Sequence, residues 1–255
     1  MIKTLEYDNL PQYLQEYKTL YYIGNKNLLN KPKVSIVGSR HPNHYAREYI
    51  STISLRLSQL GICIVSGGAM GIDTVAHKNT IDFNTIMVAG TGLDIRYPKI
   101  NSKLIEQIEN NGLVLSQFKQ NTPSYPRNFA IRNKLIVTLG DILIVGYADL
   151  NSGSLRSVEY ALKMGKEVYV LPHRIGQSDG TNKLLDEGKA KAIYNIDNFI
   201  AQFGTYNPKE EVKDDFLEYC KTTPTYDEAV LKYSQKVFEY ELLGKIYIEN
   251  GFIKI

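Results

Sequence analysis

The sequence is poor in cysteine and has no long apolar run. Only Cys63 and Cys220 occur, far apart in the chain, so neither a disulfide framework nor a zinc site is expected. No apolar stretch approaches the length of a membrane-spanning helix. Acids and tyrosines interrupt residues 1–20, where a signal peptide would have an apolar core. We therefore expect a cytoplasmic protein with no membrane contact.

The net charge of +3 is too small to identify a partner, but the charge is unevenly distributed. Residues 1–205 hold 23 Lys and Arg against 17 Asp and Glu, whereas residues 206–255 hold 7 against 10. All eight arginines lie in the first part. An anionic partner is therefore expected to meet residues 1–205.

Six short apolar runs rich in valine and isoleucine alternate with amphipathic segments. The runs are residues 33–38, 62–67, 84–90, 112–117, 141–148 and 167–173. They show little alternation, as expected of parallel strands that are covered on both faces. Repeated strand–helix–strand units predict an α/β fold with a Rossmann-like, doubly wound, mostly parallel sheet over residues 31–205.

The two ends of the chain follow other patterns. Residues 1–30 are expected to form a short helical lead-in, and the polar segment 206–213 is expected to be a linker. Residues 214–255 predict two or three helices followed by a hairpin, with Asn250-Gly251 as its turn. This order is typical of a small winged-helix-like domain.

Small residues follow several predicted strands, at the edge where open parallel sheets bind their ligands. These residues are Gly38-Ser39-Arg40, Ser66-Gly67-Gly68, Gly90-Thr91-Gly92 and Ser152-Gly153-Ser154. Glycines at a strand end let phosphate oxygens approach backbone N–H groups and helix N-termini. The pattern indicates a site for a nucleotide or a nucleic acid, although the glycines could also serve only to permit tight turns.

A dinucleotide site is one alternative, because "SGGAMG" has the fingerprint spacing and Asp94 follows it by about 20 residues. Ser66 replaces the first glycine of that fingerprint, and the loop does not follow the first strand, which weakens this reading. Asp73 and His77 could share a metal, but no third ligand is evident, so no metal is expected. Asp73 is more simply a partner of the helix dipole, and His41 and His44 are exposed polar residues.

The stretch "SYPRNFAIRNKLIV" places Arg127, Arg132 and Lys134 around Phe129, on a helix that begins near Asn128. Aromatic rings among arginines suit single-stranded nucleic acid, because bases stack on the rings while guanidinium groups pair with phosphates. The alternative is that Phe129 enters the core and the cations form a solvated helix face. The residues alone do not separate these two interpretations.

The chain resembles the DNA processing protein A (DprA/Smf) family. The resemblance rests on stretches that occur in order between about residues 33 and 190: "VSIVGSR", "IVSGGAMGID", "GTGLDIRYPKIN", "FAIRNKLIV", "SGSLRS", "GKEVYVLPH" and "SDGTNKLLDEGKA". It implies a homodimer that binds single-stranded DNA during natural transformation, protects it and helps to load the RecA recombinase. The resemblance implies neither catalysis nor a cofactor. Some family members also carry a C-terminal winged-helix domain, which could contact DNA or a partner protein.

The resemblance also implies roles for individual residues. Ser39 and Arg40 would bind phosphate, the loop from Ser66 to Gly71 would present backbone amides, and Arg127, Asn128, Phe129 and Arg132 would line the path of the strand. Met70 and Gly146 depart from the family pattern, which has arginine and glutamate there in many members. A nucleotide-processing enzyme on a related fold, the LOG-type phosphoribohydrolase, is the main alternative, but its "PGGxGTxxE" motif is absent.

Overall fold

The computed structural model describes residues 1–204, 215–242 and 245–254. The chain divides into two compact units, residues 1–206 and 207–255. The predicted linker, residues 206–213, lies outside the described residues. No helix in the described ranges is long and apolar enough to cross a membrane.

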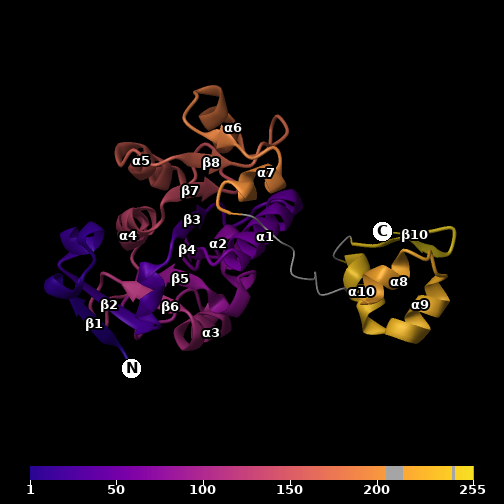
Figure 1. The fold of residues 1–255 in the computed structure, drawn as a ribbon, viewed down its shortest axis with the longest axis horizontal. Helices are drawn as coiled ribbons and strands as arrows, with labels where there is room; N and C mark the ends of the chain where they lie inside the picture. Colours follow the sequence, from indigo (N-terminus) through magenta and orange to yellow (C-terminus); the bar gives the residue numbers. More distant parts are fainter. Residues whose placement is uncertain (205–214, 243–244, 255) are drawn as a thin grey trace. The chain divides into compact units, whose positions relative to one another are not determined.

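The first unit is built on a nine-stranded sheet with the order β1-β2-β6-β5-β4-β3-β7-β8-β9 (Figure 1). The strands are β1 (Lys3–Glu6), β2 (Thr19–Gly24), β3 (Lys33–Val37), β4 (Cys63–Ser66), β5 (Thr85–Val88), β6 (Leu113–Ser116), β7 (Ile142–Val145), β8 (Val168–Val170) and β9 (Lys191–Ala192). Strands β3 to β9 pair in parallel. The chain moves outward from β3 to β6 and then returns to place β7 on the other side of β3. The prediction of an α/β, mostly parallel, doubly wound sheet is confirmed.

Seven helices accompany this sheet. They are α1 (His44–Gln59), α2 (Ile72–Lys78), α3 (Ser102–Asn111), α4 (Pro126–Leu139), α5 (Leu155–Lys163), α6 (Asp179–Asp186) and α7 (Ile196–Ala201). Figure 1 shows α4 and α5 on one side of the central strands and α1 and α2 on the other.

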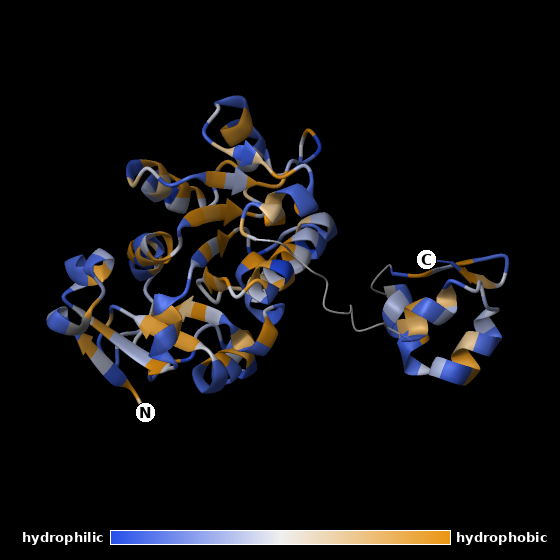
Figure 2. Cartoon of the chain, in the orientation of Figure 1, coloured by the Kyte–Doolittle hydropathy of each residue, from blue (hydrophilic) through white to orange (hydrophobic). Residues whose placement is uncertain are grey.

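Apolar residues point to both faces of the central strands, which explains the two helical layers. Ile36 and Ile64 pack in the cluster that contains α1 and α2, whereas Val65 and Val145 pack in the cluster that contains α4 and α5. Figure 2 shows the apolar colouring concentrated on these strands. A strand that is apolar on both faces must be covered on both faces, as in other parallel sheets.

The expectation of a helical lead-in over residues 1–30 is wrong. These residues form β1, β2 and the short 3-10 helices η1 (Tyr7–Asn9), η2 (Gln12–Tyr17) and η3 (Lys26–Asn30). Strand β2 pairs antiparallel with β6 and extends the main sheet. Its buried positions alternate, with Leu20 and Tyr22 turned into the core. A period of two is the signal of a half-buried strand.

The second unit contains α8 (Asp215–Cys220), α9 (Tyr226–Tyr233), α10 (Gln235–Leu242) and a hairpin of β10 (Tyr247–Glu249) and β11 (Phe252–Lys254). Asn250 and Gly251 at its turn have φ values of 51° and 80°, which suits the turns that favour these two residue types. Phe216 and Val237 lie in its small core. A capping box between Thr225 and Glu228 starts α9.

Candidate nucleic-acid interface

A pocket lies at the carboxyl edge of the sheet, where the loops after β3, β4 and β5 meet the start of α4. Its lining consists of Arg40, Gly67, Ala69, Met70, Tyr97, Pro98, Phe129 and Arg132. Four of these residues, Arg40, Gly67, Phe129 and Arg132, are predicted DNA contacts, and Ala69 and Met70 lie in the predicted loop from Ser66 to Gly71. The structure therefore brings together segments that are up to about ninety residues apart, because parallel strands end at one edge.

The loops after β3 and β4 pack directly on each other. The backbone N–H of Ile72 donates to the carbonyl of Ser39 at 3.1 Å. Gly71 has a φ of +79°, and a Cβ there would lie 2.3 Å from the Ser39 oxygen. Only glycine fits this conformation and this approach. Part of the glycine pattern is thus required by the turn itself.

Arg132 forms the floor of the pocket and is not an exposed cation. Its side chain comes from the second turn of α4 and is only 4% exposed. Nη1 donates to the carbonyl of Gly67 at 2.5 Å and also to the carbonyl of Val88. The Cβ position of Gly67 lies 2.6 Å from Nη1, so a side chain there would displace the guanidinium. Arg132 therefore lines the pocket, as expected of a residue on the strand's path, with its Nη1 held by the loop carbonyls.

Asp73 supplies a counter-charge beneath the same loop. It lies in the first turn of α2, as expected, but it is buried and accepts a hydrogen bond from the Ala69 N–H at 3.2 Å. Burial lowers the pKa of Arg132 to about 10, and the Asp73 carboxylate opposes this shift. Burial also raises the pKa of Asp73, against the pull of Arg132. The two charges are therefore electrostatic partners inside the fold.

Asn101 is a positioning residue that the sequence did not reveal. Its Nδ2 donates to the carbonyl of Gly68 at 2.9 Å and contacts the Thr74 hydroxyl at 2.8 Å. Gly68 has a φ of +74° and lies against the sulfur of Met87. Asn101 and Arg132 thus hold consecutive carbonyls of one loop. A single asparagine before a helix gives no sign of this in the sequence.

Two aromatic rings meet at the mouth of the pocket. The centroids of Tyr97 and Phe129 lie 5.4 Å apart with an angle of 36° between the rings. The Cβ position of Gly90 lies 2.6 Å from the Phe129 ring, so this glycine makes room for the ring. Phe129 is half-buried and Tyr97 is 39% exposed. Tyr97 is not among the site residues predicted from the sequence. The only indication in the sequence is that the "RYPKIN" stretch contains an aromatic residue.

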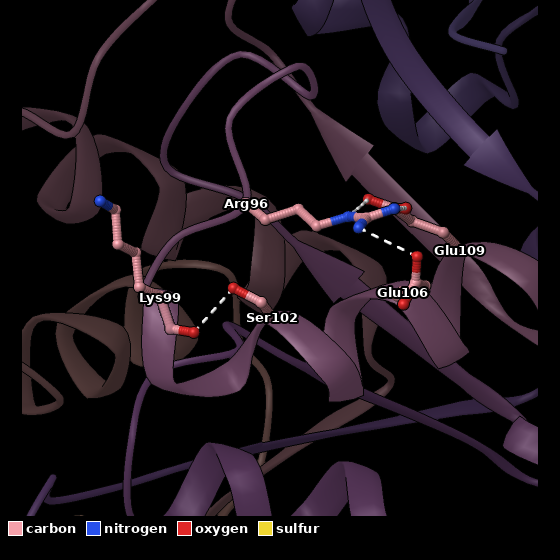
Figure 3. A network of polar contacts seen from close by, with 5 residues as sticks. All are labelled: Arg96, Lys99, Ser102, Glu106 and Glu109. Carbon is pink, nitrogen blue, oxygen red and sulfur yellow. Dashed lines mark hydrogen bonds and ion pairs between the residues drawn. The ribbon is translucent and has the colours of Figure 1, made fainter.

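Three exposed cations belong to the segments that build this site: Arg40 lines the pocket, and Lys99 and Arg127 lie two residues along the chain from Tyr97 and Phe129. The side chains of Arg40 and Lys99 form no hydrogen bond or ion pair with any described residue, and Arg127 only lies over the Tyr125 ring at 5.6 Å. Arg96, in contrast, is held by Glu106 at 3.1 Å and by Glu109 at 2.6 Å (Figure 3). Figure 3 shows the Lys99 ammonium directed away from this network. Arg40, Lys99 and Arg127 thus remain available to an anionic ligand.

The remaining predicted residues are placed less directly. Ser66 is buried and donates to the carbonyl of Ile36, and Asn128 is 4% exposed and donates to Pro123. Lys134 forms an ion pair with Glu16 at 2.6 Å and does not line the pocket. These three side chains support the site or lie beside it.

The serine loop after β7 also lies at this edge of the sheet but does not line the pocket. The hydroxyls of Ser152 and Ser154 are 2.6 Å apart, and Asn133 on α4 donates to the carbonyl of Gly153 at 3.4 Å. At Gly146 a Cβ would lie 2.6 Å from Ile50, so a glutamate does not fit there without rearrangement.

His77 is buried and does not form a metal site. Its Nδ1 lies 2.7 Å from the Thr85 hydroxyl, whose hydrogen is donated to Ile64. Nδ1 therefore carries the ring hydrogen. Nε2 is buried without a partner among the described residues. Within those residues no cluster of His, Cys, Asp and Glu could hold a metal ion.

Comparison with known proteins identifies the family. The family model described as DNA recombination-mediator protein A matches residues 2–204. The DNA processing protein DprA of Streptococcus pneumoniae is 39% identical over 72% of this chain, and Protein Smf of Synechocystis is 35% identical over 72%. The matches span 66% and 48% of the lengths of those two proteins.

Two solved structures are similar as well. One is DNA processing protein A from Helicobacter pylori, described for its single-stranded DNA binding mode, with 40% identity, a TM-score of 0.76, and coverage of 79% of this chain and 95% of that chain. The other is DprA from Streptococcus pneumoniae, with 35% identity, a TM-score of 0.74, and coverage of 80% and 75%. The chain therefore belongs to the DNA recombination-mediator protein A family.

Proposed function

We propose that the pocket binds single-stranded DNA. The observation that carries this proposal is the ring pair of Tyr97 and Phe129, which shares a pocket with Arg40 at the edge where the glycine loops meet. The exposed cations Lys99 and Arg127 lie two residues along the chain from these rings. Bases that are not paired in a duplex can stack on the rings, and the cations can meet phosphates on either side. The Helicobacter pylori relative was described for this kind of ligand.

The predicted residues then divide into two groups. Arg40, Arg127 and Phe129 contact the strand, with Ser39, Gly68, Gly71 and the Ser152-Gly153-Ser154 loop offering hydroxyl or backbone groups to phosphate oxygens. Ser66, Gly67, Asn128 and Arg132 hold the loops in shape, because hydrogen bonds inside the fold engage the three side chains and the Gly67 carbonyl. This division replaces a uniform assignment of all of these residues to DNA contact.

The biological role that fits this site is that of a recombination mediator. We propose that the protein, as a cytoplasmic homodimer, protects incoming single-stranded DNA in natural transformation and helps to load the RecA recombinase. It needs no cofactor and performs no catalysis in this role. The family membership supports this proposal. A RecA filament-assembly assay on DNA coated with a single-strand binding protein tests it, with faster assembly expected when this protein is added.

We further propose that residues 214–255 form a winged-helix-like domain that contacts a partner protein. The order of three helices and a hairpin supports the shape. Residues 206–255 have an excess of three acidic residues and no arginine, which disfavours strong binding to duplex phosphates. A truncation that ends at residue 205 is expected to fold and to bind single strands as the full chain does.

Binding measurements with three ligands test the main proposal. Fluorescence anisotropy with a single-stranded oligonucleotide, the matched duplex and a mononucleotide is repeated at several salt concentrations. We expect the single strand to bind most tightly and its affinity to fall as salt rises. Equal affinity for the duplex would contradict the proposal, because stacking on Phe129 needs an unpaired base. Release of free base from the mononucleotide would instead favour the LOG-type enzyme.

A further inference from the structure

Four rings form a continuous row beside the proposed interface. The centroids of Tyr49 and Tyr45 are 4.7 Å apart, those of Tyr45 and His173 are 5.2 Å apart, and those of His173 and Tyr147 are 5.1 Å apart. The rings come from α1 and from the loops after β7 and β8. We refer to these four residues as the ring row. None of these four residues has a role in the function proposed above.

The ring row begins where the lining of the pocket ends. The backbone N–H of Ser39 donates to the carbonyl of Tyr147 at 2.8 Å, and the next residue, Arg40, lines the pocket. Tyr147 follows β7 and His173 follows β8, so both lie at the same edge of the sheet as the pocket. A strand that leaves the pocket past Arg40 toward β7 therefore meets the ring row next.

Hydrogen bonds hold the His173 ring in place. Its Nε2 lies 3.0 Å from the carbonyl of Gly146, and its backbone N–H donates to Oδ1 of Asn182 at 3.2 Å. A carbonyl only accepts, so Nε2 carries the hydrogen and Nδ1 is an acceptor. Burial lowers the pKa of this histidine. At neutral pH it thus presents an uncharged ring.

A second contact ties the loop that follows His173 to the start of α1. Asn182 donates to the carbonyl of Gln177 at 3.1 Å, and Asn43, the N-cap of α1, donates to the side chain of Gln177 at 3.2 Å. Tyr45 lies in the first turn of that helix. The spacing between Tyr45 and His173 is therefore fixed by the fold and does not depend on the two rings alone.

Exposure and charge around the ring row suit a nucleic acid. Tyr45 is 38% exposed, whereas Tyr49, Tyr147 and His173 are half-buried. Arg47 and Arg174 are exposed nearby in the sequence, and Arg174 forms no ion pair with the described residues. Helix α1 carries one acid, Glu48, whose Oε2 lies 3.7 Å from Nδ1 of His44. Aromatic rings flanked by arginines are typical of sites for single strands.

We propose that the ring row is a second base-stacking platform, which takes the part of a single-stranded nucleic acid that leaves the pocket past Arg40. This inference rests on the proposed function of the pocket. One base stacks on Tyr45, which is the most exposed of the four rings, while His173 and Tyr147 support it from behind. The platform lengthens the bound segment and does not form a separate site for another ligand class.

Oligonucleotides of two lengths test the platform. Affinities for oligo(dT) of about 6 and about 20 nucleotides are measured for the wild type, Tyr45→Ala and Tyr45→Phe. We expect Tyr45→Ala to weaken binding of the long strand about 5- to 100-fold and to leave the short strand unchanged. Tyr45→Phe retains the ring and is expected to bind as the wild type does. Tyr7→Ala is the control, because Tyr7 is 51% exposed and follows β1 at the opposite end of the strand order.

A long oligonucleotide whose 5′ or 3′ half carries abasic sites separates stacking from charge. One of these two oligonucleotides should bind the wild type more weakly than the intact long strand does, by the same factor that Tyr45→Ala causes with the intact strand. Tyr45→Ala should bind this oligonucleotide as the wild type does, because the stacked base is already missing. Equal binding of the long strand by the wild type and a folded Tyr45→Ala would overturn the platform while leaving the pocket intact. If neither length binds the wild type, the proposed function itself fails.

Crosslinking supplies a measurement that needs no variant. Long oligonucleotides with 5-iodouracil at successive positions are irradiated with the wild-type protein, and the attached peptides are identified by mass spectrometry. Attachment to Tyr45, Tyr147 or His173 supports the platform. Attachment confined to Tyr97 and Phe129 at every position overturns it.

Discussion

Nη1 of Arg132 lies 2.5 Å from the carbonyl oxygen of Gly67. The most deeply buried cation at the interface is therefore committed to the glycine loop and to the neighbouring carbonyl of Val88. Burial is the main cause that lowers the pKa of Arg132; the Asp73 carboxylate opposes this shift and the nearby Arg40 adds to it.

Arg132→Met tests this structural role. The substitution keeps the length of the side chain but leaves two carbonyls without a donor and Asp73 without its counter-charge. We expect the free energy of unfolding to fall by about 2–5 kcal/mol, as measured by urea denaturation. Arg156→Met, at an exposed position on α5, is the matched control and should change stability by less than about 0.5 kcal/mol. A variant at Arg132 as stable as the control would contradict the assignment.

Arg40→Ala is expected to show the opposite behaviour. Arg40 is exposed and lines the pocket, so its loss should leave the melting temperature unchanged. Affinity for single-stranded DNA should fall by about 1–3 kcal/mol, as for other charged hydrogen-bonded contacts. Lys78→Ala, at the far end of α2, is a control that removes one exposed cation away from the pocket. Loss of affinity in both variants to the same degree would indicate only a general charge effect.

Phe129 and Arg127 separate stacking from charge. Phe129→Ala should weaken binding by about 1–3 kcal/mol with little change in the salt dependence, because no phosphate contact is removed. Arg127→Ala should reduce the slope of log affinity against log salt by about 1. A core phenylalanine would instead cost about 3–5 kcal/mol of stability. A Phe129→Ala protein that is strongly destabilised but binds normally would show that Phe129 is a core residue and does not stack on a base.

Gly90→Ala tests whether the position of the Phe129 ring matters. The added Cβ would lie 2.6 Å from the ring, so the ring must move away from its place beside Tyr97. We expect a severalfold loss of affinity with a stability cost of about 1–3 kcal/mol. Gly165→Ala is the control: a Cβ there meets nothing within 4 Å but φ is +68°, so it should cost about 1 kcal/mol of stability and leave affinity unchanged. Unchanged affinity of a folded Gly90→Ala protein would show that the ring need not be fixed.

The buried His77 predicts a dependence of stability on pH. Burial lowers its pKa to about 3, from an ordinary value of 6.5. Between these two values the unfolded chain binds the extra proton and the folded protein does not, so stability falls as the pH drops from about 6.5 toward 3. Protonation of Asp73, whose pKa is raised, acts in the opposite sense at the acid end.

Urea unfolding at pH 7 and pH 5 measures this effect. We expect the loss of stability between the two values to be smaller in His77→Gln than in the wild type, since glutamine does not titrate. The comparison uses the difference between pH values, so a uniform cost of the substitution cancels. An identical loss in both proteins would show that His77 titrates normally in the folded state.

The sequence by itself determined the layered part of the fold. Runs such as residues 33–38 and 141–148 are apolar on both faces, and only a sheet covered by helices on both sides satisfies such strands. The same pattern put the glycine loops at one edge, because parallel strands end together. Residues 1–30 form strands and 3-10 helices instead of the expected helical lead-in, because β2 gains its place by pairing with β6, about ninety residues further along the chain.

The tertiary structure decided which residues of these loops face the ligand. Arg127 and Arg132 are equivalent in the sequence, since both flank Phe129 on one helix. Arg127 lies at the first turn and remains exposed, whereas Arg132 lies beneath Gly67, where the missing side chain leaves room for its guanidinium. Tyr97 and Asn101 reach the site from a loop after β5. Contacts of this kind depend on how distant segments pack, so local sequence patterns do not predict them.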